Sequence, residues 1–445
     1  MSNLQTLLES DIDEEKFRGL FSSIRRGGVV SVTGIPHRTR RGELTILSAE
    51  LPKSLAPGLQ LLPTELLDPE TRIRNRHVDL LVNQQTADTL RLRSEVVQCV
   101  RDFLLRDDFL EVQTPILADG AGGAVARPFS TSATEFPEKH VNLRIAPELW
   151  LKRLILGGLD RVFEIGPSFR NEGLDLTHNP EFTTCEFYKS YADLEELVGM
   201  TETLLSALSH HVQSLKSQKF TSLSPLSIDF TPPFKRLSFI PVLESAISLT
   251  LPDLSSPSAF SSLLSIFESL SIPVPSRPTL PRLLDKLATV YLEPQCESAP
   301  TFITHHPECL APLSKSFFDP VTEQRVSARV ELFVQGRELI NAYEEENSPF
   351  EQRRKFVEQL QYKGHDEDEG MSVDESYLEA LEWGLPPTGG WGCGIDRLVM
   401  LFSGAKRIGD VLSFGSLKNV VGLAGATRMK RGELEDNETE EGRNI

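Results

Sequence analysis

Apolar residues recur about every fourth position between residues 87 and 109. Leu92, Val96, Val100 and the pair Phe103-Leu104 lie on one stripe, and arginines occupy other positions. A period near 3.6 residues is typical of an amphipathic helix, so this segment predicts a helix with one buried face. The same period follows Asp193 and predicts a second long helix. Its apolar side comprises Leu194, Leu197, Val198, Thr201, Leu204, Leu205 and Leu208.

Other segments show the two-residue period or the β-branched runs that predict strands. A first group, within residues 18–50, includes Val29–Val32 and Leu44–Leu47, with a break at Gly34-Ile35-Pro36. A helix is predicted over 349–361. Because strands and helices alternate irregularly, we predict an α+β fold on an antiparallel sheet flanked by helices. The longer predicted strands are 111–114, 161–166, 181–188 and 329–334.

Changes in composition divide the chain into segments. Residues 1–65 predict a small β-domain and a proline-marked linker, and residues 66–425 predict the main domain. Within the main domain, 221–300 is rich in Ser, Pro and Leu, which indicates a partly helical insertion without visible chemistry. Residues 366–374 predict an acidic loop. The charged segment 426–445 predicts a disordered acidic tail.

The composition adds no element to this prediction, but it argues against two classes of protein, nonspecific nucleic-acid binders and membrane-spanning proteins. The 445 residues carry a net charge of −18, from 46 basic and 64 acidic side chains. An acidic balance argues against nonspecific nucleic-acid binding, so RNA contacts would need local basic patches. Two such patches, at 38–41 and 72–77, are interpreted as solvated faces. No stretch approaches the roughly 18 to 20 apolar residues of a membrane helix.

Five scattered cysteines without C-x-x-C spacing indicate a reducing compartment, and they argue against disulfides or a zinc ribbon. His305, His306 and Cys309 lie close together in sequence, and we interpret them as a surface turn. The acidic residues 1–15 do not resemble a targeting signal. We therefore expect either that the protein stays where it is made or that its natural N-terminus is missing from this sequence.

The densest chemical signal is FRNEG at 169–173, followed by THNPEFT at 177–183. The pattern predicts two strands joined by a loop. Arg170 suits planar contacts with phosphate or carboxylate, Phe182 offers a face on which a purine can stack, and Glu172 could accept a hydrogen bond from an exocyclic amine.

Two further segments strengthen this signal. In GGWGCGIDRL, residues 389–398, alternating glycines clear one strand face for a ligand and lead to Arg397 at the start of an apolar helix. Glu331 and Glu338 could jointly hold Mg²⁺ that bridges phosphates, because Mg²⁺ takes one or two carboxylates plus phosphate oxygens. The alternative for these two carboxylates is a solvated acidic hairpin.

Together these segments resemble the motifs of class II lysyl-tRNA synthetases, over residues 27 to 420 apart from the insertion. The segment around 91–115 resembles motif 1, which implies a homodimer interface. FRNEG and THNPEFT resemble motif 2, and GIDRL resembles motif 3. NAYEEEN at 341–347 distinguishes the lysine enzyme from its aspartate and asparagine relatives.

The resemblance implies a role for each candidate residue, with Arg170 and Arg397 as the catalytic pair. ATP would be bound by Arg170, Glu172, His178, Phe182 and Arg397, and Mg²⁺ by Glu331 and Glu338. Lysine would be bound by Gly123, Glu148, Glu186, Tyr188, Asn341 and Glu345. This last set also makes chemical sense by itself, because a buried ammonium needs carboxylates and hydrogen-bond acceptors.

The resemblance further implies that ATP and lysine form lysyl-adenylate, from which lysine passes to tRNA(Lys). In the family an N-terminal OB-fold reads the anticodon, and here only a partial OB-like domain is expected. Trp391 and Cys393 replace smaller or aliphatic residues of some relatives, and we expect that adenine still fits. Two alternatives are a lysyl transferase that acts on a protein, and a non-catalytic binding or regulatory relative. Residues 413–421 resemble fungal mitochondrial relatives, so the mitochondrial matrix is expected, with the cytoplasm as the alternative.

Overall fold

The computed structural model describes residues 5–8, 14–119, 123, 126–362 and 373–426. The chain forms two units, residues 1–87 and 88–445. The sequence-based boundary after residue 65 stays a prediction, and the structure groups the following residues up to Ala87 with the first unit. Most of the predicted acidic loop and tail lies outside the described residues.

The described residues of the first unit form five short strands in two small sheets, with strand orders β1-β4-β3 and β2-β5. Residues 18–23 lie in α1 and are helical, so the strand prediction was wrong there. The predicted break is found at Gly34, between β2 and β3, but Ile35 and Pro36 already belong to β3. Pro36 is tolerated because β3 is an edge strand. The elements are β1 (Gln5–Leu8), α1 (Glu14–Ser23), β2 (Val29–Ser31), β3 (Ile35–Arg38), β4 (Leu44–Ser48) and β5 (Lys53–Ala56).

Two short helices, α2 (Pro69–Arg74) and α3 (Arg76–Val82), complete this unit. Asp79 is buried between them and accepts hydrogen bonds from Arg72 Nε at 2.9 Å and Arg76 Nη1 at 3.1 Å. Arg76 is only 3% exposed. The predicted solvated basic face at 72–77 is therefore wrong for this arginine, because its charge is paired inside the helix pair.

The second unit is built on an eight-stranded sheet in the order β12-β13-β16-β17-β18-β11-β10-β6. All neighbours in this sheet are antiparallel except the pairs β12/β13 and β10/β6 at its two ends. The predicted α+β fold with an antiparallel sheet is confirmed. The strands are β6 (Leu110–Glu111), β10 (Arg161–Phe169), β11 (Glu181–Ser190), β12 (Lys235–Ser238), β13 (Thr301–Thr304), β16 (Arg329–Val334), β17 (Arg337–Glu344) and β18 (Thr388–Gly394).

Three helices pack on one face of this sheet: α4 (Gln84–Arg106), α6 (Leu194–Gln218) and α12 (Ile395–Ser403). Four residues of the predicted stripe of α4, Leu92, Val96, Val100 and Leu104, are each at 0% exposure, whereas Phe103 is partly buried. Burying such a side chain contributes about 1.5–3 kcal/mol to folding. The two short helices α13 (Ile408–Val411) and α14 (Leu417–Ala426) follow α12.

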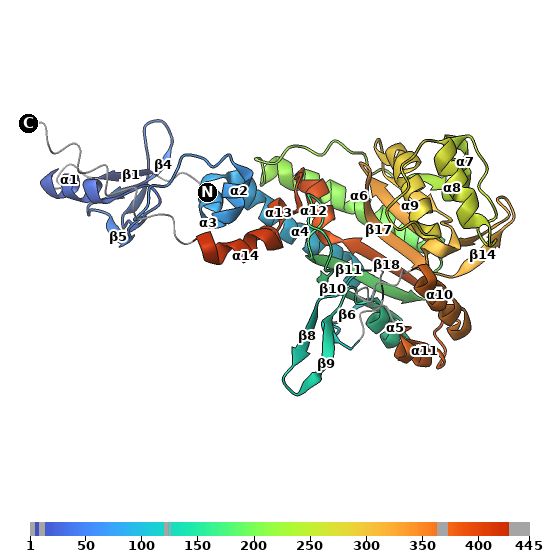
Figure 1. The fold of residues 1–445 in the computed structure, drawn as a ribbon. Coiled ribbons are helices and arrows are strands. Elements are labelled where there is room, and N and C mark those ends of the chain that lie inside the picture. Colours follow the sequence, from blue (N-terminus) through green and yellow to red (C-terminus); the bar gives the residue numbers. More distant parts are fainter. Residues whose placement is uncertain (1–4, 9–13, 120–122, 124–125, 363–372, 427–445) are drawn as a thin grey trace, which may run out of the picture. The chain divides into compact units, whose positions relative to one another are not determined.

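Three other helices, α5 (Glu148–Leu156), α10 (Pro349–Tyr362) and α11 (Glu375–Leu381), share a second apolar core. This core contains Tyr188 of β11, whereas its neighbour Phe187 belongs to the first core. Because successive strand residues point to opposite faces, the two helix groups cover opposite faces of the sheet. Figure 1 shows the hairpin of β8 (Ser130–Ala133) and β9 (Phe136–Leu143), paired with β7 (Leu117–Ala118), standing away from the sheet.

The insertion predicted over 221–300 is partly helical, as expected. It contains α7 (Phe239–Ile247), α8 (Ala259–Ser269) and α9 (Leu280–Tyr291), which pack around a core of their own. A short 3-10 helix at Glu293–Cys296 links α9 to β13, and another follows β13 at Glu308–Leu310. The hairpin of β14 (Ser316–Asp319) and β15 (Gln324–Ser327) leads on to β16.

The predicted strand at 111–114 is shorter in the structure, where β6 ends at Glu111. Beyond it, the Glu164 carboxylate accepts hydrogen bonds from Thr114 N at 3.0 Å and Thr114 Oγ1 at 2.7 Å. The N–H group of Thr114 therefore donates to the side chain of Glu164 instead of to a neighbouring strand, as it would if β6 were longer. Within the described residues, no helix combines the length and apolar character that a membrane span needs.

Candidate active site

A cavity of about 960 Å³ opens over the middle of the large sheet. Its walls come from the loop between β10 and β11, from β16 and β17, from β18 and the start of α12, and from α9. Of the thirteen predicted site residues, Glu345 alone is not part of the cavity lining. The other twelve are Gly123, Glu148, Arg170, Glu172, His178, Phe182, Glu186, Tyr188, Glu331, Glu338, Asn341 and Arg397.

The floor of the cavity is the glycine-rich strand β18. Gly392 lies opposite Glu186 of β11, and Gly390 lies opposite Tyr188. A Cβ atom added at Gly390 would lie 1.9 Å from Oε1 of Glu345. Glycine is therefore required here, because any side chain would collide with this buried carboxylate.

The alternate residues of β18 point away from the cavity. Trp391 is buried in the core, donates a hydrogen bond from Nε1 to Thr201 Oγ1 of α6 at 2.9 Å, and stacks on Phe187 with ring centroids 4.9 Å apart. Cys393 lies in the same core. The side chains of these two residues are thus packed in the core, although both residues contribute to the cavity lining, and the expectation that adenine fits stays a prediction.

One end of the cavity is rich in buried carboxylates. Glu148 and Glu186 are 3% and 9% exposed, and Tyr343 donates a hydrogen bond to Glu148 Oε2 at 3.1 Å. Gly123, with φ of 97°, lies close to this glutamate, since an added Cβ would be 3.2 Å from Glu148 Cβ. Burial, and next the charge of Glu148, raise the pKa of Glu186 to about 8. This end is suited to a cation.

Behind these carboxylates lies a residue that sequence reasoning missed. Lys152 of α5 is fully buried and forms ion pairs with Glu148, at 2.6 Å between Nζ and Oε1, and with Glu345. Burial raises the pKa of Glu345, and the Lys152 ammonium opposes that rise. Glu345 is thus partnered from behind the cavity, which explains why it does not line it. In sequence, the four-residue spacing from Glu148 was the available signal.

A second part of the cavity, called the arginine end below, is cationic and partly exposed. The guanidinium of Arg170 lies over the Phe182 ring, 5.1 Å from its centroid. Arg397 is 26% exposed at its side chain, donates to the backbone oxygen of Glu338 at 3.0 Å, and lies 2.7 Å from His178 Nε2. Two predicted phosphate contacts from distant parts of the sequence thus meet at the same point.

His178 is oriented by Asp175, a second residue that sequence reasoning missed. Asp175 Oδ2 lies 2.7 Å from His178 Nδ1, and its other oxygen accepts from the backbone N–H groups of Thr177 and His178. Burial opposes ionisation, but these hydrogen bonds outweigh it and lower the pKa of Asp175 to about 2. A proton on Nδ1 leaves Nε2 as the acceptor that faces Arg397. The signal was an Asp two residues before a Thr, the pattern of an Asx turn.

The predicted metal ligands lie on the neighbouring strands β16 and β17. Glu331 is paired with Arg329, which also donates to Asn341 Oδ1 at 2.9 Å, and with His306 Nε2 at 3.0 Å. Burial would raise the pKa of Glu331, but Arg329 and His306 outweigh it and lower this pKa to about 2. Burial, with the charge of Glu331, raises the pKa of Glu338.

Two interpretations from the sequence were wrong in this region. His306 is 2% exposed and Cys309 is 9% exposed, so they are not part of a surface turn. The insertion also contributes to the site, because Asp285, Thr289 and Glu293 line the cavity. Within the part of the chain that the structure describes, no cluster of three or more His, Cys, Asp or Glu side chains is placed to hold a metal ion.

The two arginine-bearing segments are held together from below by Asp396. Its carboxylate accepts from Arg93 Nη1 of α4 at 2.5 Å and from Thr183 N of β11 at 2.8 Å. Arg93 also donates to Thr183 Oγ1 at 2.9 Å. This buried network joins three elements that are far apart in sequence, so that Phe182 and Arg397, the neighbours of Thr183 and Asp396, face one cavity.

Comparison with known proteins agrees with this geometry. Residues 68–418 match the family model described as tRNA synthetases class II (D, K and N). The chain belongs to this family. The match spans every segment that lines the cavity, including the insertion.

Among the class II synthetases, its relatives include lysine–tRNA ligases. The chain is 40% identical over 429 residues to lysine–tRNA ligase cla4 of Cladosporium cladosporioides, covering 94% of this chain and 71% of that protein. It is 41% identical over 415 residues to the mitochondrial lysine–tRNA ligase of Schizosaccharomyces pombe, covering 92% and 77%. It is 37% identical over 412 residues to the lysine–tRNA ligase of Clostridium tetani, covering 92% and 80%. The expected membership of the lysine-specific branch is confirmed.

Proposed function

We propose that this class II synthetase is a lysine–tRNA ligase, which activates L-lysine with ATP and transfers the lysyl group to tRNA(Lys). One observation carries the proposal: a single cavity has buried carboxylates in one part and two arginines in another. An amino acid with a cationic side chain and a nucleoside triphosphate match these two ends. Neither a protein-directed lysyl transferase nor a non-catalytic relative is favoured by the named relatives.

The amino-acid subsite is formed by Glu148, Glu186, Tyr188, Asn341 and Glu345, with Gly123 closing over it. Carboxylates repay the desolvation of the substrate ammonium, which costs several kilocalories per mole when a charge is buried without partners. Tyr188 adds an aromatic face and a hydroxyl group that lies 3.4 Å from Glu186 Oε2. The α-carboxylate of lysine then points toward Arg170.

The nucleotide subsite is formed by Arg170, Glu172, His178, Phe182 and Arg397. Adenine stacks on Phe182 and donates its amino group to Glu172, while Arg170 contacts the α-phosphate. His178 and Arg397 bind the distal phosphates. Their mutual contact at 2.7 Å supports this assignment, because two side chains that already touch can bind neighbouring phosphate oxygens.

Activation proceeds by attack of the lysine carboxylate oxygen on the α-phosphorus. A new P–O bond forms as the bond to the leaving pyrophosphate breaks, which gives lysyl-adenylate. The nucleophile is already an anion, so no general base is needed, and the residues act by positioning and by stabilising negative charge. In the second step the 3′-hydroxyl of the tRNA attacks the adenylate carbonyl, and AMP leaves.

We also propose Mg²⁺ as the ion that Glu331 and Glu338 hold. Two carboxylates fit Mg²⁺, which completes its shell with phosphate oxygens and water. Glu338 lies against Arg397, at 3.8 Å between Oε2 and Nη1, so the ion and the distal phosphates would share one location. When bound, the ion neutralises charge on the leaving pyrophosphate.

The function is tested by lysine-dependent exchange of labelled pyrophosphate into ATP, followed by charging of tRNA(Lys). The expected result is exchange with lysine at least about 100-fold faster than with ornithine or arginine, because an unpaired buried carboxylate costs about 3–5 kcal/mol. Equal exchange with several amino acids would contradict the lysine assignment. Exchange without tRNA charging would support the protein-directed alternative.

A homodimer through residues 91–115 is a further part of this proposal. The segment carries apolar side chains that are exposed in the single chain, with Leu105 at 46% and Leu110 at 50%. We propose that a second copy covers them. Light scattering on the parent chain and on Leu110→Glu tests this, and a monomeric parent would contradict it.

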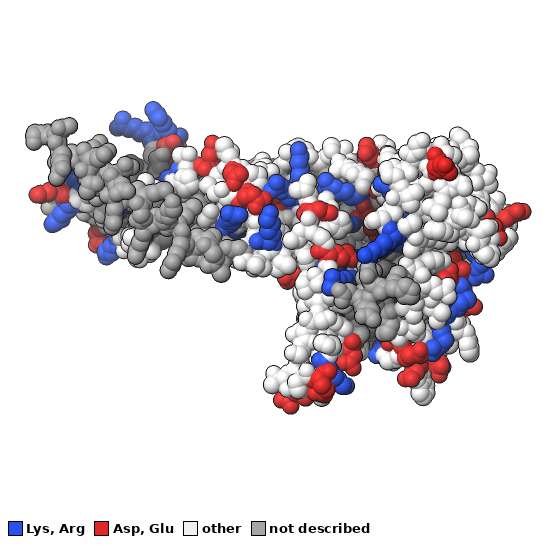
Figure 2. All heavy atoms as spheres, in the orientation of Figure 1, with Lys and Arg blue, Asp and Glu red and all other residues white. Residues whose placement is uncertain are grey.

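For tRNA binding, we propose local basic contacts rather than a continuous basic surface. On the face of the second unit drawn in Figure 2, Lys and Arg side chains are interspersed with Asp and Glu. In the first unit, Arg38, Arg40 and Arg41 are exposed in and just after β3. Their replacement by alanine should raise the KM for tRNA and leave pyrophosphate exchange unchanged.

For the compartment, we propose the mitochondrial matrix. The relatives include both the mitochondrial ligase named above and a probable cytoplasmic lysine–tRNA ligase of Enterocytozoon bieneusi, which is 43% identical over 408 residues. Imaging of the tagged full-length gene product separates the two compartments.

A further inference from the structure

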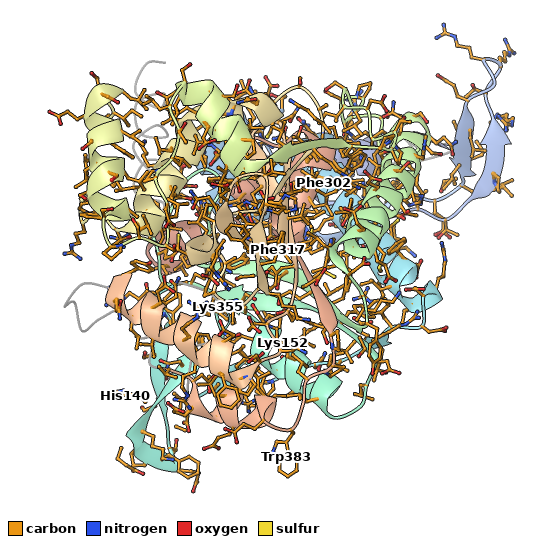
Figure 3. All side chains as sticks on the ribbon, turned by 90° about the vertical axis from the view of Figure 1, so that its right-hand side faces the viewer. His140, Lys152, Phe302, Phe317, Lys355 and Trp383 are labelled. Carbon is orange, nitrogen blue, oxygen red and sulfur yellow. The ribbon has the colours of Figure 1, made fainter. Side chains whose placement is uncertain are left out.

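The protein has an ammonium group of its own, that of Lys152, beside the proposed subsite for the lysine substrate. Lys152, one helical turn after Glu148 on α5, is 0% exposed. Its Nζ lies 5.8–5.9 Å from the ring centroids of Tyr188, Tyr343 and Tyr377. Figure 3 shows it in the interior of the second unit, whereas Trp383 projects from the surface. The reaction steps described above leave this buried cation without a role.

The Lys152 ammonium pairs with only one carboxylate oxygen of each of two glutamates, Glu148 and Glu345. It pairs with Oε1 of Glu148 and with Oε2 of Glu345. The other oxygen of Glu148 accepts from Tyr343. The other oxygen of Glu345 has no hydrogen-bond partner among the described residues, and it lies against Gly390, which lines the cavity. A buried acceptor thus remains free beside the point where a ligand would enter.

The charge of Lys152 opposes protonation of the buried Glu345 carboxylate. Burial by itself lowers the pKa of Lys152, but Glu148 and Glu345 outweigh it and raise this pKa above its ordinary value. Conversely, burial raises the pKa of Glu345, and Lys152 is the cation that opposes it. Without the ammonium, a buried carboxyl group would take up a proton and lose its attraction for a cation.

We infer that Lys152 is a positioning residue that makes the amino-acid subsite selective for a cation. Its ammonium fixes one oxygen of Glu148 and one oxygen of Glu345, and it leaves the other oxygen of Glu345 without a hydrogen-bond partner against Gly390, beside the proposed site of the substrate ammonium. Lys152 itself does not touch the reacting atoms. The inference deepens the proposed function and rests on it.

The test compares Lys152→Met with Lys355→Met in lysine-dependent pyrophosphate exchange. Lys355 of α10 is a matched control, because it is 3% exposed, pairs with Glu346 at 2.8 Å and does not line the cavity (Figure 3). Lys152→Met should raise the KM for lysine about 100-fold, the cost of losing one partner of a buried charge pair, with the KM for ATP unchanged. Lys355→Met should leave both KM values within about twofold. Lys355 does not line the cavity, so its replacement should affect the stability of the fold and not the binding of either substrate.

A second readout separates selectivity from stability. Lys152→Met should narrow the preference for lysine over its uncharged analogue norleucine, because protonated carboxyl groups no longer demand a cation. Lys152→Gln keeps the hydrogen bonds without the charge and should give the same change, which covers the case in which the methionine variant does not fold.

These experiments distinguish failure of the proposed function from failure of the role proposed for Lys152. A parent chain that does not exchange with lysine would overturn the proposed function, and this inference with it. A parent that exchanges, together with Lys152 variants whose lysine KM and norleucine preference match those of Lys355→Met, would overturn the role of Lys152 alone.

Discussion

The two ends of the cavity differ in how deeply their charged side chains are buried. At the carboxylate end, Glu148, Glu345 and Lys152 are almost completely buried and already paired. At the arginine end, His178 is 54% exposed and Arg397 is 26% exposed at the side chain. Burial strengthens electrostatic discrimination, whereas exposure leaves room for a large, multiply charged ligand. If the proposed subsites are right, this difference predicts a preorganised amino-acid subsite and a nucleotide subsite with more freedom to adjust to its ligand.

The largest effect is expected at the arginine end. Arg170→Ala should lower kcat of pyrophosphate exchange by about 10²–10³, as for the loss of one preorganised charge stabiliser. Arg236→Ala, which removes an exposed arginine paired with Glu195, is the control and should leave the rate unchanged. Exchange at the parental rate in Arg170→Ala would exclude the α-phosphate contact.

The next effect tests how tightly the carboxylate end is built. Gly390→Ala places a methyl group 1.9 Å from Glu345, whereas Gly392→Ala places one 3.6 Å from Glu186 Cγ. The first should raise the KM for lysine about 30-fold, because overpacking a buried site costs about 1–3 kcal/mol, and the second should raise it less than threefold. If both variants bound lysine equally well, the carboxylate end would be less rigid than described.

The pH dependence should separate the two ends. The raised pKa of Glu186, about 8, means that this group is protonated below pH 8 and ionised above it in the empty site. Lysine binding then requires loss of the proton, so the KM for lysine should fall up to about tenfold per unit between pH 6 and 8 and then level off. Glu186→Gln should reduce this slope. The KM for ATP serves as the internal control, and a parallel slope in it would contradict the assignment.

The smallest effect concerns the orientation of His178. Asp175→Asn should raise the KM for ATP about threefold to tenfold, since a side-chain hydrogen bond to a charged group contributes about 1.5–3 kcal/mol and this one is solvent-exposed. Asp229→Asn is a matched control, because Asp229 forms the same turn with Thr231 away from the cavity. Equal KM values in both variants would show that His178 needs no support.

Much of the fold followed from local pattern. The buried stripe of α4 and the strands β10, β11 and β16 were predicted because periods of 3.6 and 2 residues reveal which face of an element is buried. The prediction failed where long-range contacts compete with local preference. Val112 still donates a backbone hydrogen bond to Phe163, but Thr114 leaves the ladder because Glu164, 50 positions later in the chain, binds its N–H group.

The same division holds for the site. The sequence by itself determined which residue types the chemistry needs, because the motifs supply Arg170 and Phe182 and because the alternating glycines clear one face of their strand. Only the tertiary structure decided that Lys152 lies behind Glu345, that His306 is buried against Glu331, and that α9 closes the cavity. The physical reason is that each of these contacts joins segments that are far apart in sequence. The periodicity of a helix or strand predicts only which face of that element is buried, so tertiary packing alone decides which segments meet.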